Sequence, residues 1–164
     1  MGQVNIGGYV PGAIGKITEL HATWYHRHWS FGPYFERKVA TELSEFFGRF
    51  DEKEDGLWLA AFEGCILGSI AIDGIKRENK GAHLRWFIVD TEYQGQGIGT
   101  MLIRKALEFC EKCRYRRVYL WTFAGLNGAR HLYETHGFSL CQEHEDSQWG
   151  VILREQMFER LFEL

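Results

Sequence analysis

The segment Gln94-Gly95-Gln96-Gly97-Ile98-Gly99 places a glycine at every second position between two apolar patterns of different period. The apolar run that ends at Val89 is typical of a strand, whereas apolar residues after Gly97 recur every three or four positions, as in a helix. Glycine adopts positive φ without strain and lets another molecule approach the backbone closely. The first N–H groups of a helix have no acceptor within it and attract anions. The segment therefore predicts a strand-to-helix turn that binds a phosphate or pyrophosphate.

The spacing of these glycines also has to be compared with other uses of a glycine-rich turn. The glycines could simply make a tight connection without a ligand. A dinucleotide-binding turn has the spacing Gly-x-Gly-x-x-Gly near the first strand and an acidic residue about 20 positions later, whereas here the glycines alternate after the fourth predicted strand. A P-loop requires Gly-Lys followed by Ser or Thr, and no lysine lies in this turn. A tight connection and an anion-binding turn of another kind remain open.

Hydrophobic periodicity and turn residues divide the chain into alternating strand and helix patterns. Strands are predicted at residues 4–9, 57–62, 65–72, 82–89, 117–122, 138–144 and 151–162. Helices are predicted from after Pro11 to about residue 26, from an entry at 30–33 to about residue 50, from 98 to 113, and from 127 to 136. The strands on either side of Glu63-Gly64 predict a hairpin. Helices interleaved with strands that are partly joined as hairpins predict an α/β (α+β) fold with a mixed sheet.

Length and composition limit the class of protein. A chain of 164 residues suits one hydrophobic core, so residues 1–164 are predicted to form a single domain. A net charge of −3 gives no broad positive field, which argues against a nucleic-acid partner. No run approaches the roughly 20 apolar residues of a membrane span, so no membrane association is expected. Four cysteines without a recognisable secretion signal favour reduced thiols and a cytoplasmic location.

The cysteines and histidines do not form a convincing metal-binding motif. Cys110-x-x-Cys113 falls inside a predicted helix, and no second Cys-x-x-Cys or paired-histidine motif completes a zinc site. His26 and His28 are two positions apart and do not face one another on a helix. No metal is therefore expected.

Two separated segments resemble the GCN5-related N-acetyltransferase (GNAT) family. The family's pyrophosphate-binding signature is Gln or Arg, two residues, Gly, one residue, then Gly or Ala, and Gln94 to Gly99 matches each position. Residues 127–138 resemble the family's Asn-x-x-Ala-x-x-x-Tyr-x-x-x-Gly-Phe pattern, although Ala129 comes one place early. In addition, Leu84-Arg85-Trp86-Phe87 and the late runs 147–150 and 154–159 resemble the acetyltransferase half of MarR-type regulator fusions. The winged-helix half is absent from this sequence, so no role in transcription follows.

The resemblance implies a mixed, mostly antiparallel sheet flanked by helices, with splayed central strands and acetyl-CoA in the gap between them. The pantetheine arm would pair with strand backbone like an added strand. The positions implied to contact the cofactor are Phe87, Ile88, Val89, Gln94, Gly95, Gln96, Gly97, Ile98, Gly99, Thr100 and Asn127. The side chains of the three strand residues could at the same time belong to the sheet core. Asn127 begins a predicted helix and could instead be its N-cap.

The resemblance also implies a reaction, in which a primary amine of an unidentified small-molecule or peptide acceptor attacks the thioester of acetyl-CoA directly. Tyr133 is the candidate acid that protonates the leaving sulfur, or it only packs or hydrogen-bonds there. The base stays open, since family members differ and some use a chain of waters. His83 could relay a proton near neutral pH or be structural.

Two further residues are candidates for binding the acceptor. Arg85 shares a face with His83 by strand alternation, and it could anchor an acceptor carboxylate or pair with an internal acid. Trp29 lies in an aromatic-rich stretch between the first two helices, which could form a wall of the acceptor site or part of the core. The alternative function is a non-catalytic acyl-CoA sensor or interaction module with the same fold. Pairing of exposed strands near the C-terminus would give a homodimer, as in many relatives.

Overall fold

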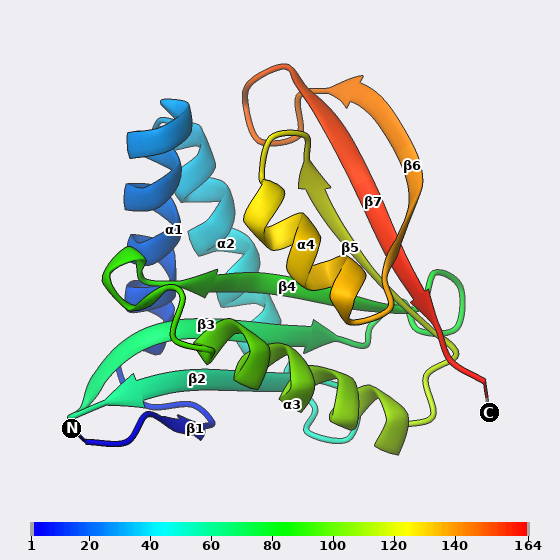
Figure 1. The fold of residues 1–164 in the computed structure, drawn as a ribbon, viewed down its shortest axis with the longest axis horizontal. Helices are drawn as coiled ribbons and strands as arrows, with labels where there is room; N and C mark the ends of the chain where they lie inside the picture. The colour runs from blue at the N-terminus through cyan, green and yellow to red at the C-terminus, as the bar shows by residue number, and fades with distance from the viewer. Residues whose placement is uncertain (1, 164) are drawn as a thin grey trace.

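Seven strands form a single sheet in the order β1-β2-β3-β4-β5-β7-β6 in the computed structural model, which describes residues 2–163 (Figure 1). The strands are β1 (Asn5–Gly7), β2 (Gly56–Phe62), β3 (Cys65–Asp73), β4 (Ala82–Val89), β5 (Arg117–Phe123), β6 (Ser139–Asp146) and β7 (Leu153–Leu161). Within the described chain β4 and β5 are parallel, and every other neighbouring pair is antiparallel. The predicted mixed, mostly antiparallel sheet is confirmed.

Helices cover both faces of this sheet. They are α1 (Ala13–Trp29), α2 (Pro33–Gly48), α3 (Ile98–Lys112) and α4 (Asn127–Thr135), with a short 3₁₀ helix, η1 (Thr91–Tyr93), before α3. Figure 1 shows α1 and α2 on one face and α3 and α4 on the other. Each face has its own buried cluster, because side chains alternate across β2, with Leu59 facing α1 and α2 and Ala60 facing α3. No helix within residues 2–163 is long and apolar enough to cross a membrane.

Local chemistry accounts for the element boundaries. The β2–β3 hairpin turns at Glu63 and Gly64, both at positive φ, as a two-residue turn between twisted strands requires. Helix α1 runs to Trp29, three residues further than predicted, because Ser30 takes the left-handed conformation and donates its N–H to the carbonyl of His26. Pro33 opens α2 at a position where its missing N–H costs nothing. The last strand begins at Leu153 rather than Val151, after a turn at Gly150 with φ 91°.

The central strands β4 and β5 separate soon after they meet. They pair at Ala82–Val118 and at His83–Tyr119, and beyond these pairs toward their carboxyl ends they diverge (Figure 1). This confirms the splayed central strands. Strand β4 also has a bulge at Trp86, whose φ is 47°. The hydroxyl of the fully buried Ser69 donates to the carbonyl of Trp86 at 2.6 Å.

The bulge also changes which face each side chain of β4 occupies. Leu84 faces α3, and strict alternation would put Trp86 on the same face. Trp86 instead packs with the α1 and α2 cluster, and Phe87 then returns to the α3 side. Arg85 and Trp86 therefore share the face toward α1 and α2, with the guanidinium carbon 4.2 Å from the indole centroid.

Candidate active site

A cleft of about 630 Å³ lies where β4 and β5 separate. Its walls come from α1, α2, β4, β5, α4, β6 and β7, together with the β3–β4 and β6–β7 loops. The residues that the sequence predicted for the site and that line this cleft are Phe87, Tyr133, His83 and Arg85. The fold therefore brings the predicted acid to one cavity together with His83 and Arg85, but not with Trp29.

The glycine-rich turn lies directly after β4, at the end of this opened strand. Gly95 and Gly97 have φ of 76° and 82°, and a Cβ at either would meet no atom of residues 2–163 within 4 Å. Gly97 is the N-cap of α3 and offers no side chain, so first-turn N–H groups of α3 stay available to an outside acceptor. Gln94 closes the turn by donating from Nε2 to the carbonyl of Val89 at 3.0 Å. The turn thus has the open backbone that a pyrophosphate needs.

The third glycine of the turn has a different task. A Cβ at Gly99 would lie 3.2 Å from Leu132 and 3.4 Å from Phe87, so its small size lets α3 approach α4 and β4. The side chain of Ile98 is buried in the core, whereas Gln96 is exposed and Thr100 is half-buried beside the first turn. Close packing therefore explains Gly99, whereas Gly95 and Gly97 have the open surroundings that an anion-binding turn would need.

The strand segment Phe87, Ile88 and Val89 presents one free edge. On one side Ile88 and Val89 pair with Ser69 and Gly68 of β3, and on the other side no strand of the described chain pairs with them. The side chains of Phe87 and Val89 pack against the core, with the Phe87 ring centroid 6.0 Å from that of Tyr133. Core packing of the side chains and an open backbone edge therefore coexist, and an extended ligand could add to this edge.

Helix α4 carries Asn127 and Tyr133. Leu126, not Asn127, occupies the N-cap position, and no side chain caps this helix, so the N-cap role considered for Asn127 is wrong. The Tyr133 ring is buried against Phe138 and Phe158. The Tyr133 hydroxyl has no hydrogen-bond partner within residues 2–163. Because every fully buried polar side-chain atom in that range has a partner, the hydroxyl is not fully buried and is open to the cleft that Tyr133 lines. Burial, and to a smaller extent the charge of Tyr25, raise the pKa of Tyr133, which keeps its proton at neutral pH.

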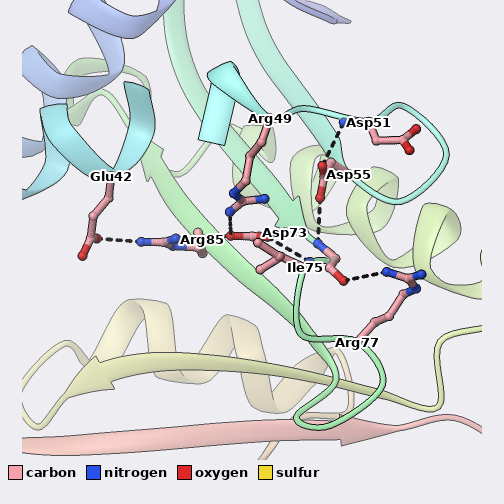
Figure 2. A network of polar contacts seen from close by, with 9 residues as sticks. Glu42, Arg49, Asp51, Asp55, Asp73, Ile75, Arg77 and Arg85 are labelled. Atoms are coloured by element: carbon pink, nitrogen blue, oxygen red, sulfur yellow. Dashed lines mark hydrogen bonds and ion pairs between the residues drawn. The ribbon is translucent and has the colours of Figure 1, made fainter. Parts of the chain in front are cut away.

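Arg85 is held by acids of the protein (Figure 2). Its guanidinium donates to Glu42 of α2 at 2.6 Å and to Asp73 of β3 at 3.3 Å, and Arg49 donates to the same Asp73 oxygen at 2.6 Å. Lys38 binds the other oxygen of Glu42 at 2.6 Å. Of the two roles expected for Arg85, the structure contains the pairing with internal acids.

For His83 and for Trp29 the sequence left two roles open. The His83 ring stacks on Tyr119 at 4.5 Å, and burial together with the charges of Arg85 and Lys76 lowers its pKa to about 3, against an opposing effect of Asp73. His83 is therefore neutral at pH 7, and its stacking on Tyr119 agrees with the structural role that the sequence also left open. Trp29 does not line the cleft; it packs edge-on against Phe123 at 4.7 Å, so it belongs to the core wall behind the site.

Several residues that line the cleft had no role of their own in the sequence analysis, although Tyr25 belongs to the aromatic-rich stretch that contains Trp29. His21 and Tyr25, four positions apart on α1, face it together, and that spacing could have placed them on one helix face. Trp149 enters from the β6–β7 loop and contacts Phe123 at 5.5 Å between ring centroids. Trp149 lies in the run 147–150 that carried the resemblance to MarR-type regulator fusions, but this loop has no periodicity, so spacing gave Trp149 no place in the site.

The cleft is positively charged, although the chain as a whole is negative. Its ionised lining residues are Lys38, Lys76, Lys80, Arg85, Arg117 and Glu42. Lys38, Arg85 and Arg117 each have an acidic partner, whereas Lys76 and Lys80, on the loop between β3 and β4, have no carboxylate within 4.0 Å among the described residues. The unpaired lysines form a basic end where an anionic group could bind.

One group of side chains within residues 2–163 has metal-ligand chemistry. His144, Asp146 and Glu155 of the β6–β7 hairpin have ligand atoms within 4.8 Å of one another. Both oxygens of Glu155 already accept hydrogen bonds from Gln148, so this carboxylate has a structural partner. The cleft at the strand fork does not include these three residues.

A family model and curated relatives match much of this chain. The model described as "Acetyltransferase (GNAT) family" matches residues 16–138. An N-acetylaspartate synthetase from Danio rerio is 34% identical over 144 residues, covering 87% of this chain and 50% of that protein. Human N-acetyltransferase 8B is 26% identical over 151 residues, covering 90% of this chain and 66% of that protein. The chain spans about half the length of the curated relatives it matches.

Solved structures share the fold. An acetyltransferase of the GNAT family from Staphylococcus aureus superimposes with a TM-score of 0.79 at 20% identity, covering 98% of this chain and 100% of that one. An acetyltransferase from Salmonella typhimurium, solved with its cofactor acetyl-CoA, gives a TM-score of 0.78 at 15% identity, covering 99% and 96% of the two chains. At these identities the likeness establishes the architecture of the sheet and helices.

Proposed function

Because the chain belongs to the acetyltransferase (GNAT) family, we propose that it transfers the acetyl group of acetyl-CoA to a primary amine, by direct attack in a ternary complex. We propose residues 1–164 as one N-acetyltransferase domain. The observation that carries the proposal is the junction of an open strand edge at Phe87–Val89 with a glycine turn whose N–H groups are free. The strand edge suits the pantetheine arm and the turn suits the pyrophosphate.

The roles proposed for individual residues follow the direction of the reaction. Backbone N–H groups from Gly95 to Thr100 bind the pyrophosphate, and Asn127 contacts the cofactor from α4. The acceptor nitrogen attacks the thioester carbon, the carbon–sulfur bond breaks, and Tyr133 gives its proton to the leaving sulfur. Tyr133 keeps its proton over the physiological pH range, as this role requires, and its hydroxyl is open to the cleft. No covalent enzyme intermediate is needed.

We propose that the acceptor carries a carboxylate besides its amine. The support is the basic end of the cleft, where Lys76 and Lys80 have no acidic partner within the described chain. Arg85 is already paired with Glu42 and Asp73, so the lysines are better placed than Arg85 to bind an acceptor anion. Relatives named N-acetylaspartate synthetase take their name from an acetylated acidic amino acid, which agrees with such an acceptor.

A turnover assay tests the proposal. Release of the CoA thiol from acetyl-CoA is measured against aspartate, glutamate, neutral amino acids, polyamines and N-terminal peptides. Acceptor-dependent release, greatest with acidic amino acids, is the expected result. Saturable acetyl-CoA binding without turnover on any acceptor would instead establish the non-catalytic sensor, and absence of binding would overturn the cofactor site itself.

Other expectations from the sequence stay predictions. A homodimer, a cytoplasmic location, the absence of a metal and the likeness to MarR-type regulator fusions have no test in the contacts described above. β6 is an edge strand with exposed residues throughout, which supports strand pairing between two copies as a hypothesis.

A further inference from the structure

His21 is a buried titratable residue for which the proposed reaction has so far no role. It lies on the cleft side of α1, and its relative exposure is 6%. Its Nδ1 lies 2.7 Å from the carbonyl oxygen of Ile17, one turn earlier, and a carbonyl can only accept, so Nδ1 carries the hydrogen. In the neutral ring Nε2 is then an acceptor with a free lone pair.

Nε2 of His21 is open to the cleft. It has no hydrogen-bond partner within residues 2–163, and no polar side-chain atom there is both fully buried and without a partner. Because His21 lines the cleft, Nε2 therefore meets the cavity. The bond to Ile17 fixes both the tautomer and the direction of the ring, an arrangement that makes a histidine effective toward a substrate.

We propose that Nε2 of His21 is the base that takes the proton from the attacking acceptor amine. This inference rests on the proposed acetyltransferase function and assigns the base, which that proposal does not identify. Burial lowers the pKa of His21 to about 4, so the ring is neutral before the attack at physiological pH.

The position of His21 relative to Tyr133 supports the assignment. Tyr25 lies one turn after His21 on α1, with parallel rings 6.4 Å apart, and both line the cleft. Tyr133 lines the same cleft from α4, and Tyr25 is near enough for its charge to raise the pKa of Tyr133. A base on α1 and an acid on α4 would thus both reach a thioester bound in this cleft. His83, in contrast, has no side-chain hydrogen bond within residues 2–163 to fix its tautomer, and it lies where β4 and β5 are still paired.

The proposed step balances without a further reagent. The amine nitrogen forms a bond to the thioester carbon, and its acidity rises as that bond forms, so a weakly basic imidazole suffices. Nε2 takes the proton of that nitrogen, and the carbon–sulfur bond breaks with its electron pair on sulfur. Tyr133 protonates the sulfur. The imidazolium then returns its proton to solvent, and Tyr133 is reprotonated.

Two variants of His21 test the proposal in the full chain. His21→Asn keeps a side-chain N–H that can donate to Ile17 but removes Nε2, and we expect kcat/KM to fall about 100-fold with an unchanged Kd for acetyl-CoA. His21→Ala leaves space for a small base, and we expect added imidazole to restore its rate at least tenfold in proportion to imidazole concentration. His28→Asn is the matched control, since His28 makes the same bond one turn back, to Trp24 at 2.9 Å, on the exposed side of α1.

The outcomes separate this inference from the proposed function. If the unaltered protein turns over and His21→Asn stays within threefold of it, His21 is not the base while the acetyltransferase stands. A large loss that imidazole does not reverse, or one matched by an equal loss of acetyl-CoA affinity, assigns His21 to packing and also overturns the inference. Absence of turnover in the unaltered protein would reject the proposed function instead.

Discussion

The side chain of Tyr133 belongs to the core through its ring and to the cleft through its hydroxyl. The ring contacts Phe87, Phe138 and Phe158, and these contacts survive replacement by phenylalanine. We expect Tyr133→Phe to lower kcat about 100-fold, because the proton for the leaving sulfur is lost, while the Kd for acetyl-CoA stays within twofold. Thiol release and calorimetric binding measure the two quantities.

A matched tyrosine outside the cleft serves as control for Tyr133. Tyr115 is also buried, and its hydroxyl donates to the carbonyl of Glu54 at 2.5 Å, away from the cleft. Tyr115→Phe should cost about 1 kcal/mol of stability and leave kcat unchanged. An equal loss of kcat in both variants would mean that general destabilisation, not proton donation, explains the effect at Tyr133.

Asp73 has a pH-dependent share in the stability of the fold. Burial raises its pKa, but the hydrogen bonds from Arg49 and the Ile75 N–H, with the charges of Arg49 and Arg85, bring the pKa below its ordinary value. A carboxylate of this kind stabilises the fold above its unfolded pKa of about 4, and that stability is lost as pH falls through the folded pKa. We expect Asp73→Asn to lower the free energy of unfolding by about 2 kcal/mol at pH 7.

The same reasoning predicts how the Asp73 effect changes with pH. The difference between Asp73→Asn and the unaltered protein should narrow as pH falls from 5 toward 2, when Asp73 itself takes up a proton. Urea unfolding at several pH values measures it. Glu19→Gln, which removes an exposed pair with Lys16 at 3.3 Å, should change stability by less than about 0.5 kcal/mol at any pH. A constant difference at every pH would contradict the ionic account.

At the scale of elements, the turn before α3 and the turn before α1 make a natural comparison. Gly97 and Gly12 are both N-caps with φ of 82° and 92°, and a Cβ at either would meet no atom of residues 2–163 within 4 Å. Alanine at either position should therefore cost a similar strain, about 1 kcal/mol. In Gly97→Ala the new methyl group lies where the pyrophosphate would approach. We expect this variant to weaken acetyl-CoA binding at least tenfold, and Gly12→Ala to leave it unchanged.

The elements that the sequence predicted well are those whose pattern is local. The glycine turn, the amphipathic helix after it and the hairpin at Glu63-Gly64 follow from spacing and turn chemistry, and each lies where it was predicted. The glycine turn lies directly after β4, where we propose that the cofactor binds. The sequence pattern could reveal Gly95 and Gly97 as exposed turn positions because neither glycine has a packing role in the described chain.

The acceptor end of the cleft depends on contacts that spacing does not carry. Strict alternation along β4 cannot reveal the bulge at Trp86, which arises from the buried bond between Ser69 and the Trp86 carbonyl, 17 positions apart in sequence. The pairing of Arg85 with Glu42 likewise joins β4 to α2 through the tertiary fold. An ordinary pKa was the natural assumption for His83, since its burial against Tyr119 becomes evident only in the folded sheet.

At the scale of the whole molecule, the distribution of charge separates the cleft from the rest of the surface. The chain has a net charge of −3, yet the ionised groups that line the cleft are mostly lysine and arginine. A local positive field in a negative protein attracts anions to the cleft and repels them elsewhere. The positive field should therefore favour binding of an acidic acceptor in the cleft, and added salt should weaken the field.

The two unpaired lysines allow this field to be tested. We expect Lys76→Gln combined with Lys80→Gln to raise KM for an acidic acceptor at least tenfold, and to change KM for an uncharged amine less than twofold, because only the anion loses its partner. Lys53→Gln combined with Lys112→Gln removes the same total charge from exposed positions outside the cleft, and it should leave both KM values unchanged. Steady-state kinetics at 0.05 M and 0.5 M salt measures the effect. In the unaltered protein KM for the acidic acceptor should rise with salt, and in the variant with Lys76→Gln and Lys80→Gln this rise should disappear. If both double variants raised KM equally, net charge rather than the position of Lys76 and Lys80 would select the acceptor.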